Sequence, residues 1–226
     1  MFAASFLCGS LLVNTFKLAA FAAVVLCVSL VVRGQSTIVG GSHDFSAWPS
    51  TGADDYSNSG QICKPCHTPH NATSTSVSDR LWNHTLSTVS YKLHTISSSS
   101  AGGVTELDRQ SRLCLGCHDG TVALDSFGGA INPTGGKMVG KANFKADLSN
   151  DHRLGIEAVF DANNPDPALH TLDEVQAKLP LATMGTGDQL KWVVSCMTCH
   201  DPHMSQSKML RIDNTGSALC FTCHHT

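Results

Sequence analysis

The chain has 226 residues with 15 basic and 18 acidic side chains, so its formal net charge is −3. It offers no basic patch for a nucleic-acid backbone, and we expect no nucleic-acid partner. From Gln35 onward, Leu, Ile, Val and Phe make up 37 of 192 residues, about 19%, which is close to the level at which side chains fail to build a core. The net charge of this part is a modest −5, so charge does not explain the missing apolar bulk.

The first 34 residues have the pattern of a secretory signal peptide. They contain no acidic residue, and an apolar run from Leu18 to Val32 follows a single lysine. Fifteen apolar residues fall short of the roughly 20 that a membrane-spanning helix needs, which disfavours the alternative of a retained anchor. We therefore predict cleavage between Gly34 and Thr37 and an exported mature chain, residues 35–226, without a membrane span.

Eight cysteines lie after the leader in four pairs, and a histidine follows each pair directly. The motifs are Cys63-Lys-Pro-Cys66-His67, Cys114-Leu-Gly-Cys117-His118, Cys196-Met-Thr-Cys199-His200 and Cys220-Phe-Thr-Cys223-His224. Cys-x-x-Cys-His is the attachment sequence of c-type haem. Its two thiols form thioethers with the two vinyl groups of the porphyrin, and the next histidine becomes the proximal iron ligand. Four motifs that use every mature cysteine predict four covalently bound haems.

Two other uses of the cysteines compete with haem. The last two pairs are spaced C-x2-C-x20-C-x2-C, close to a zinc ribbon, but zinc gives no reason for a histidine after all four pairs. Export favours structural disulfides, yet a bridge within C-x-x-C is typical of redox motifs rather than structural links. The spacing therefore favours haem.

All twelve histidines lie after the leader, so eight remain for the distal side of four irons. A histidine on both sides closes the coordination of iron and favours electron transfer, whereas an open sixth position permits substrate chemistry. The distal candidates are His43, His70, His152, His203 and His84. One of these five is surplus or is offered to another subunit. The remaining histidines, His94, His170 and His225, are predicted to be surface residues.

Sequence context supports four of these candidates. His70 and His203 occur in the matched settings Cys-His-Thr-Pro-His and Cys-His-Asp-Pro-His. His43 and His152 each have an adjacent aspartate, and we expect that carboxylate to orient the imidazole, as carboxylates near metal ligands commonly do. Methionine is the other possible sixth ligand, but the methionines show no pattern.

The predicted fold is a single domain, mostly irregular with a few short α-helices and little or no β-structure, organised around four stacked haems. It contains a two-haem pseudo-repeat, about 38–125 and 150–226. A helix is predicted over Thr105–Cys117, capped by Thr105, and a short one after Thr171, where Glu174 completes a capping box and Pro180 stops the helix. One more helical turn is expected over Leu219–His224.

The sequence resembles the multihaem cytochromes with doubled C-x-x-C-H motifs. Within them it is most similar to the OmcE type, the extracellular four-haem cytochromes that polymerise into conductive filaments. The segments that carry the resemblance are Ser42–Asp44, Cys63–Asn71, Leu81–His84, Leu113–Leu124, Asp151–His152, Cys196–His203 and Asp213–His224. Arg153 stands where relatives often have Pro.

The resemblance implies bis-histidine haems in a continuous chain and head-to-tail polymerisation, in which one ligand can cross between subunits. A homo-oligomeric filament at the cell surface would pass electrons to partner cytochromes or an extracellular acceptor. A soluble periplasmic electron shuttle is the alternative, and it would carry the same motifs. An enzyme is the third possibility, a multihaem reductase with one open haem.

Overall fold

The computed structural model describes residues 37–47, 61–70, 72, 80–94, 107–129, 135–160 and 166–225. The chain separates into two compact units, Met1–Ser36 and Thr37–Thr226. The predicted signal peptide lies in the first unit and outside the described residues. Within the described ranges, no helix is both long enough and apolar enough to cross a membrane.

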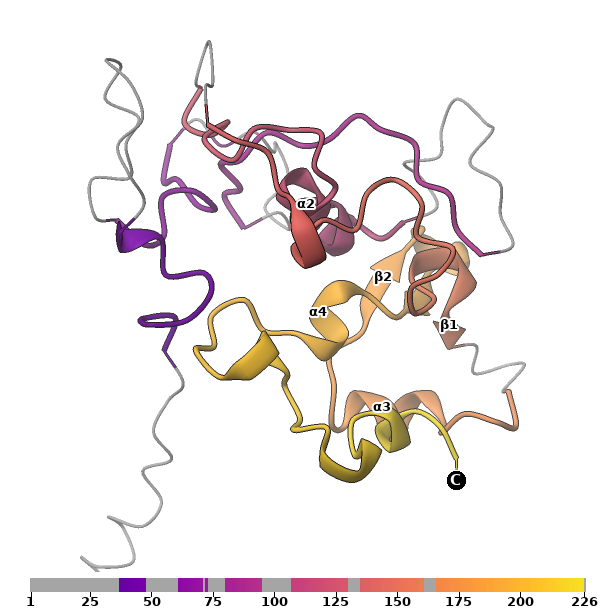
Figure 1. The fold of residues 1–226 in the computed structure, drawn as a ribbon. Helices are drawn as coiled ribbons and strands as arrows, with labels where there is room; N and C mark the ends of the chain where they lie inside the picture. Colours follow the sequence, from indigo (N-terminus) through magenta and orange to yellow (C-terminus); the bar gives the residue numbers. More distant parts are fainter. Residues whose placement is uncertain are drawn as a thin grey trace, which may run out of the picture. The chain divides into compact units, whose positions relative to one another are not determined.

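Most of the described chain in the second unit is irregular, as predicted, and its helices and strands are short (Figure 1). The α-helices are α2 (Arg109–His118), α3 (Leu172–Gln176) and α4 (Cys196–Cys199). The strands are β1 (Val159–Phe160), β2 (Ala182–Met184) and β3 (Lys191–Val193). Single 3-10 turns are found at Phe45–Ala47, Gly140–Ala142, Gly155–Glu157, Gly187–Gln189, Ser207–Met209, Thr215–Ser217 and Cys220–Thr222.

The three strands form one small antiparallel sheet in the order β1-β3-β2. In the central strand β3, Val193 lies opposite Val159 and Ala182, and it is fully buried. The prediction of little β-structure is confirmed.

Helix α2 carries the second cysteine motif and begins later than predicted. Its N-cap is Asp108, which is buried and accepts a 2.8 Å hydrogen bond from the Ser111 backbone amide. The predicted cap, Thr105, lies outside the described residues, and the described helix begins at Arg109 because Asp108 has an extended backbone. Asp108 is the better cap because its carboxylate also accepts a 2.6 Å bond from the Ser111 hydroxyl.

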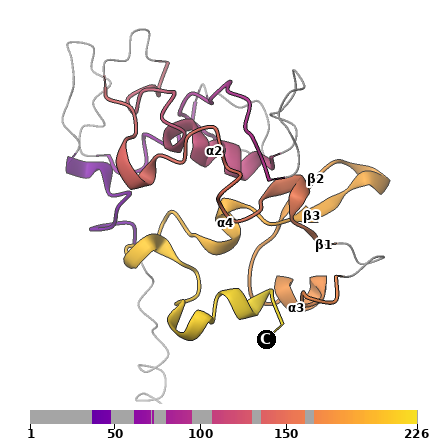
Figure 2. The same cartoon turned by 45° about the vertical axis from the view of Figure 1, so that its right-hand side comes forward.

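The two predictions near the C-terminus hold in outline. Thr171 caps α3 with the capping box to Glu174, and α3 ends at Gln176, before Pro180. The last cysteine motif forms the 3-10 turn Cys220–Thr222 rather than a longer helix. Both views place α3 beside the end of the described chain (Figures 1 and 2), where Leu169 and His224 form an antiparallel bridge.

Buried apolar side chains form two small clusters instead of one large core. The first contains Tyr91, Leu93, Leu107, Leu115 and Leu148. The second contains Phe160, Val175, Leu179 and Val194. Leu154 packs against both clusters. Two clusters of this size leave room for apolar bulk that side chains do not supply.

Candidate functional site

All four cysteine motifs form one helical turn. In three of them the histidine amide donates to the carbonyl of the first cysteine four residues earlier, at 2.8 Å for His67, 3.0 Å for His200 and 2.9 Å for His224. The second motif lies at the end of α2. This turn brings both thiols and the histidine of each motif together, which is the arrangement that double thioether attachment needs. All eight thiols are free.

Two segments that carry Cys-x-x-Cys-His-x-Pro-His repeat one backbone design. We name them the first histidine loop (residues 63–70 and 80–83) and the second histidine loop (residues 196–211). In the first, His67 bridges to Trp82; in the second, His200 bridges to Leu210. Two consecutive non-glycine residues have left-handed backbone in each loop, with φ of 55° and 57° at Arg80 and Leu81, and of 58° and 53° at Lys208 and Met209.

The left-handed residues have a clear consequence for the motif histidines. The carbonyl of Arg80 accepts a 2.8 Å bond from Nδ1 of His67, and the carbonyl of Lys208 does the same for His200. His118 in the second motif is held in the same way by the Ala142 carbonyl, at 2.8 Å. Once Nδ1 is fixed by a carbonyl, Nε2 is the nitrogen left for a metal.

Three of the four motif histidines face a second imidazole. Ring centroids are 6.0 Å apart for His118 and His43, 6.2 Å for His67 and His203, and 6.3 Å for His224 and His152. The partners come from sequence positions far from the motifs they face. Each of these three partners was a distal candidate in the sequence.

These separations fit two ligands on opposite sides of one metal ion. A metal–imidazole bond is about 2.0 Å long, and the ring centroid lies about 1.1 Å beyond the bonded nitrogen, so two opposed rings have centroids about 6 Å apart. The three separations are therefore compatible with two imidazole ligands of one iron ion.

The structure does not bring a second ring to His200 among the described residues, and it places His70 on the surface without a ring partner there. His70 follows the first motif as His203 follows the third. His203 reaches the first motif, but His70 does not reach the third. Among the described residues, His200 is therefore the one motif histidine without a facing imidazole.

His84, the fifth candidate, lies inside the protein and is 1% exposed. Nδ1 lies 2.8 Å from the Thr85 carbonyl, and Nε2 lies 3.1 Å from the Ala123 carbonyl. Burial lowers its pKa. Both ring nitrogens therefore face backbone oxygens, an arrangement that suits a structural histidine better than an iron ligand.

Backbone carbonyls, not carboxylates, orient the distal imidazoles His43 and His152. Nδ1 of His152 lies 2.9 Å from the carbonyl of Arg153, and Nδ1 of His43 lies 3.3 Å from that of Pro202. Asp44 instead accepts bonds from Gly40 and Ser46 in its own turn. Asp44 therefore bonds within its own turn and does not orient His43 as expected.

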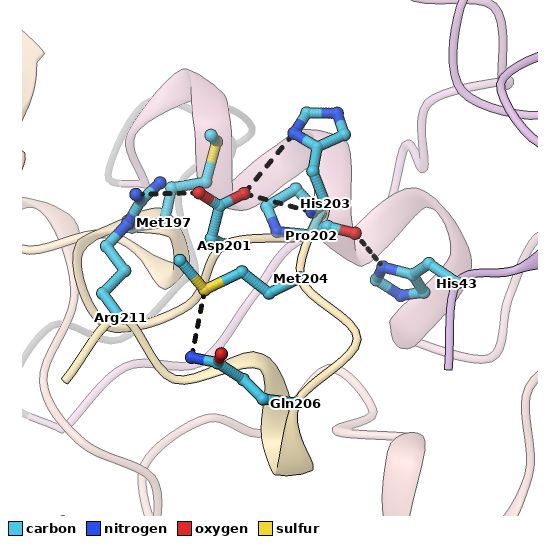
Figure 3. Close-up of polar contacts among 8 residues, drawn as sticks. All are labelled: His43, Met197, Asp201, Pro202, His203, Met204, Gln206 and Arg211. Carbon is cyan, nitrogen blue, oxygen red and sulfur yellow. Dashed lines mark hydrogen bonds and ion pairs between the residues drawn. The ribbon is translucent and has the colours of Figure 1, made fainter. Parts of the chain in front are cut away.

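The second histidine loop is held by an ion pair that the sequence analysis missed (Figure 3). Arg211 lies 3.0 Å from Asp201 and donates through Nε to the Met197 carbonyl at 2.8 Å. The other oxygen of Asp201 lies 3.4 Å from Nδ1 of His203. This aspartate therefore sits between the two histidines of the loop and fixes the second one.

In the first histidine loop Asn83 takes the place of Arg211. Its amide donates to the Lys64 carbonyl at 2.6 Å, the equivalent of the Met197 carbonyl, and its oxygen accepts from Gly128 at 3.0 Å. Asn83 is 2% exposed. The two loops thus share a backbone design with different side chains.

The thiols of successive motifs are neighbours. Burial raises the pKa of Cys117 to about 12, and the nearby Cys66 thiol adds to that rise. Burial also raises the pKa of Cys199 to about 11, with the Cys223 thiol adding to it. Between these pairs, Cys114 donates a hydrogen bond to the Cys196 sulfur. Motif one thus adjoins motif two, two adjoins three, and three adjoins four.

A cavity of about 320 Å³ opens between the second and third motifs. Its lining combines apolar side chains with histidine rings and motif thiols. The histidines and cysteines are His43, His118, His152, His200, Cys114, Cys196 and Cys199. Phe144, which is 46% exposed, lies at 5.9 Å from the His118 ring. Apolar space beside paired imidazoles and free thiols fits a covalently held porphyrin. Among the described residues no three potential ligands converge as zinc would require.

Residues 192–226, with the third and fourth motifs, match the protein family described as "Doubled CXXCH motif". No curated protein matches the chain. The match is confined to these residues, and it supports a multihaem c-type cytochrome. The motifs indicate covalently bound c-type haem, which is in keeping with a role in electron transfer.

Proposed function

We propose that this chain carries four c-type haems and conducts electrons as one subunit of an extracellular head-to-tail filament. Within one chain, His43, His203 and His152 close the irons held by His118, His67 and His224. The fourth iron, held by His200, takes His70 of a neighbouring copy as its second ligand.

The observation that carries the proposal is the mismatch between the two histidine loops. His203 faces a motif histidine at 6.2 Å, while His70 in the matched position is exposed and His200 has no facing ring among the described residues. His70 of one copy can complete the site at His200 of the next copy. The two surfaces in contact then differ, so the contact is heterologous. Such contacts produce open filaments when the rotation between copies does not close.

The proposed ligands assign each haem a closed coordination sphere. Haem supplies one-electron redox chemistry when bound, and two imidazoles favour electron transfer over substrate binding. The chain's own residues hold the rings in place through Nδ1 and keep the attachment sites adjacent in sequence order. That order supports a continuous path from the first haem to the fourth.

The test is His70→Ala in the secreted holoprotein. We expect four haems by mass, loss of filaments in electron micrographs, and a ferrous spectrum that changes on adding carbon monoxide because one sixth position has opened. His94→Ala, at another exposed histidine, is the control and should retain filaments. Filaments in His70→Ala would contradict the inter-subunit ligand.

A second candidate is a reductase that keeps the His200 iron open. It is favoured by the same observation, that no imidazole faces His200 among the described residues. Carbon monoxide distinguishes the two functions, because the reductase would bind it in the unmodified protein, whereas the filament subunit would bind it only after His70 is replaced.

A further inference from the structure

Two histidines that face no motif histidine lie close together beside the last motif. The ring centroids of His170 and His225 are 4.2 Å apart, with an interplanar angle of 57°. The His170 side chain is 26% exposed, and His225 is exposed. Both were predicted from the sequence to be surface residues.

The backbone holds these two rings on one side of a short antiparallel ladder. Leu169 bridges to His224, the His170 amide donates to the Cys223 carbonyl at 2.8 Å, and the His225 amide donates to the Ala168 carbonyl at 3.1 Å. Side chains alternate between the two faces of such a ladder. His170 and His225 therefore point away from the face of His224, and their site is separate from the proposed iron.

The ring separation fits two neighbouring positions around one metal ion. With a ring centroid about 3.1 Å from the metal, a separation of 4.2 Å corresponds to an angle of about 85° at the metal. This differs from the 6.0–6.3 Å pairs, whose rings lie on opposite sides. Near-right angles are the geometry of square-planar and tetragonal sites, which Cu²⁺ and Ni²⁺ prefer.

A neighbouring carboxylate supports the first ring. Oε2 of Glu174 lies 3.6 Å from Nδ1 of His170, and the capping box holds that carboxylate through Thr171 at 2.8 and 2.9 Å. Metal-bound histidines commonly have a carboxylate on their other nitrogen. This placement leaves Nε2 of His170 as the nitrogen for a metal.

We propose that His170 and His225 form a surface site for a divalent transition metal ion, with Cu²⁺ bound most tightly. Imidazole suits copper and nickel, and Cu²⁺ has the highest affinity of the first-row divalent ions for nitrogen ligands. Two histidines supply adjacent ligands, and water completes the coordination. The proposal does not depend on the filament, because neither residue takes part in it.

The test uses the secreted holoprotein with its haems attached, titrated with Cu²⁺ and followed by calorimetry and electron paramagnetic resonance. We expect one site with two nitrogen ligands, bound more weakly by Ni²⁺. His225→Asn and His170→Asn should each lower the Cu²⁺ affinity roughly 100-fold, because two ligands on one scaffold raise each other's effective concentration, and should leave one nitrogen in the spectrum.

His94→Asn is the matched control, since His94 is exposed and lies outside the pair. An unchanged haem spectrum in each variant verifies that the fold is intact. Equal Cu²⁺ affinity in His225→Asn and the unmodified protein would overturn the proposal. So would an equal loss in His94→Asn, or a holoprotein that binds no Cu²⁺.

Discussion

The first and second histidine loops have nearly the same backbone but different surroundings. Each has a motif turn, a carbonyl from a left-handed residue on the motif histidine, and a side chain that bonds the carbonyl after the first cysteine. The second loop adds the Asp201–Arg211 ion pair, and its last histidine faces an imidazole in the same chain. The comparison indicates that a shared scaffold positions the motif histidine, whereas side chains outside the motif determine what the second histidine reaches.

The largest effect should come from removing one haem attachment in each loop. Two double variants test this: Cys63→Ala with Cys66→Ala in the first loop, and Cys196→Ala with Cys199→Ala in the second. Each should lose the mass of one iron porphyrin. A buried haem contributes on the order of 10 kcal/mol as an upper bound. The second-loop variant should melt at the lower temperature by circular dichroism, because that loop holds His200 and also His203, which faces the first motif. A lower melting temperature for the first-loop variant would contradict the larger contribution that we assign to the second loop.

The next largest effect concerns the side chains that hold the loops. Asn83→Ala removes a buried side chain together with its hydrogen bonds to the Lys64 carbonyl and the Gly128 amide, and we expect a loss of about 2 kcal/mol in the free energy of unfolding. Arg211→Ala should cost about 1 kcal/mol, because its ion pair is partly exposed and solvent screens it. Urea denaturation of the holoproteins measures both. Equal losses of unfolding free energy in the two variants would mean that the deeper burial of Asn83 does not make it more stabilising than Arg211.

Arg211→Lys separates the two contributions of the arginine. Lysine keeps the positive charge but has no Nε–H for the Met197 carbonyl. A loss in Arg211→Lys as large as that in Arg211→Ala would assign the effect to the hydrogen bond, whereas full retention would assign it to the charge.

A smaller effect should appear in redox potentials. Asp201→Asn removes a negative charge 3.4 Å from Nδ1 of His203, so the haem proposed to bind His203 should become easier to reduce. We expect a rise of roughly 40 mV, equivalent to about 1 kcal/mol. Spectroelectrochemical titration measures it. Thr68→Ala is the control at the matched position of the first loop. It does not alter the charge and should leave the redox potentials unchanged.

The smallest effect should come from Asp147, which pairs with Lys92 outside both loops and serves as a reference for them. Hydrogen bonds from Ser149 and Lys92 lower the pKa of Asp147 from its ordinary 3.8 to about 2. A lowered carboxyl pKa contributes stability that is present above pH 3.8 and is lost as the pH falls towards 2. Asp147→Asn should therefore flatten the acid side of the stability profile in this window only. An unchanged profile between pH 4 and 2 would contradict this role for Asp147.

Local rules predicted the local features of the fold. The capping box at Thr171 and Glu174 formed as expected, because every atom it needs lies within three residues. At α2 the prediction named Thr105 as the cap, whereas Asp108 caps the described helix and accepts two bonds from Ser111. The helical turns of the second and fourth motifs were also predicted, whereas those of the first and third were not.

Pairing of distal histidines could not be predicted from local rules. His43 and His118, or His67 and His203, meet only through long-range packing, and the sequence did not indicate which motif each of the five candidates would face. The carbonyls on His67 and His200 come from left-handed Arg80 and Lys208, a conformation that costs non-glycine residues roughly 1–2 kcal/mol each and has no sequence signal here. The Asp201–Arg211 ion pair was missed because no pattern in the sequence indicates which residues the loop brings together.

The placement of His203 has a consequence for how the protein matures. This histidine belongs to the loop of the third motif, yet its ring centroid lies 6.2 Å from that of His67 in the first motif. Under the proposed ligation, a haem inserted at the third motif would rigidify a ligand of the haem at the first. Under this pairing, haem incorporation is cooperative, and secreted intermediates that hold only the first haem should be rare compared with apoprotein and the fully loaded form.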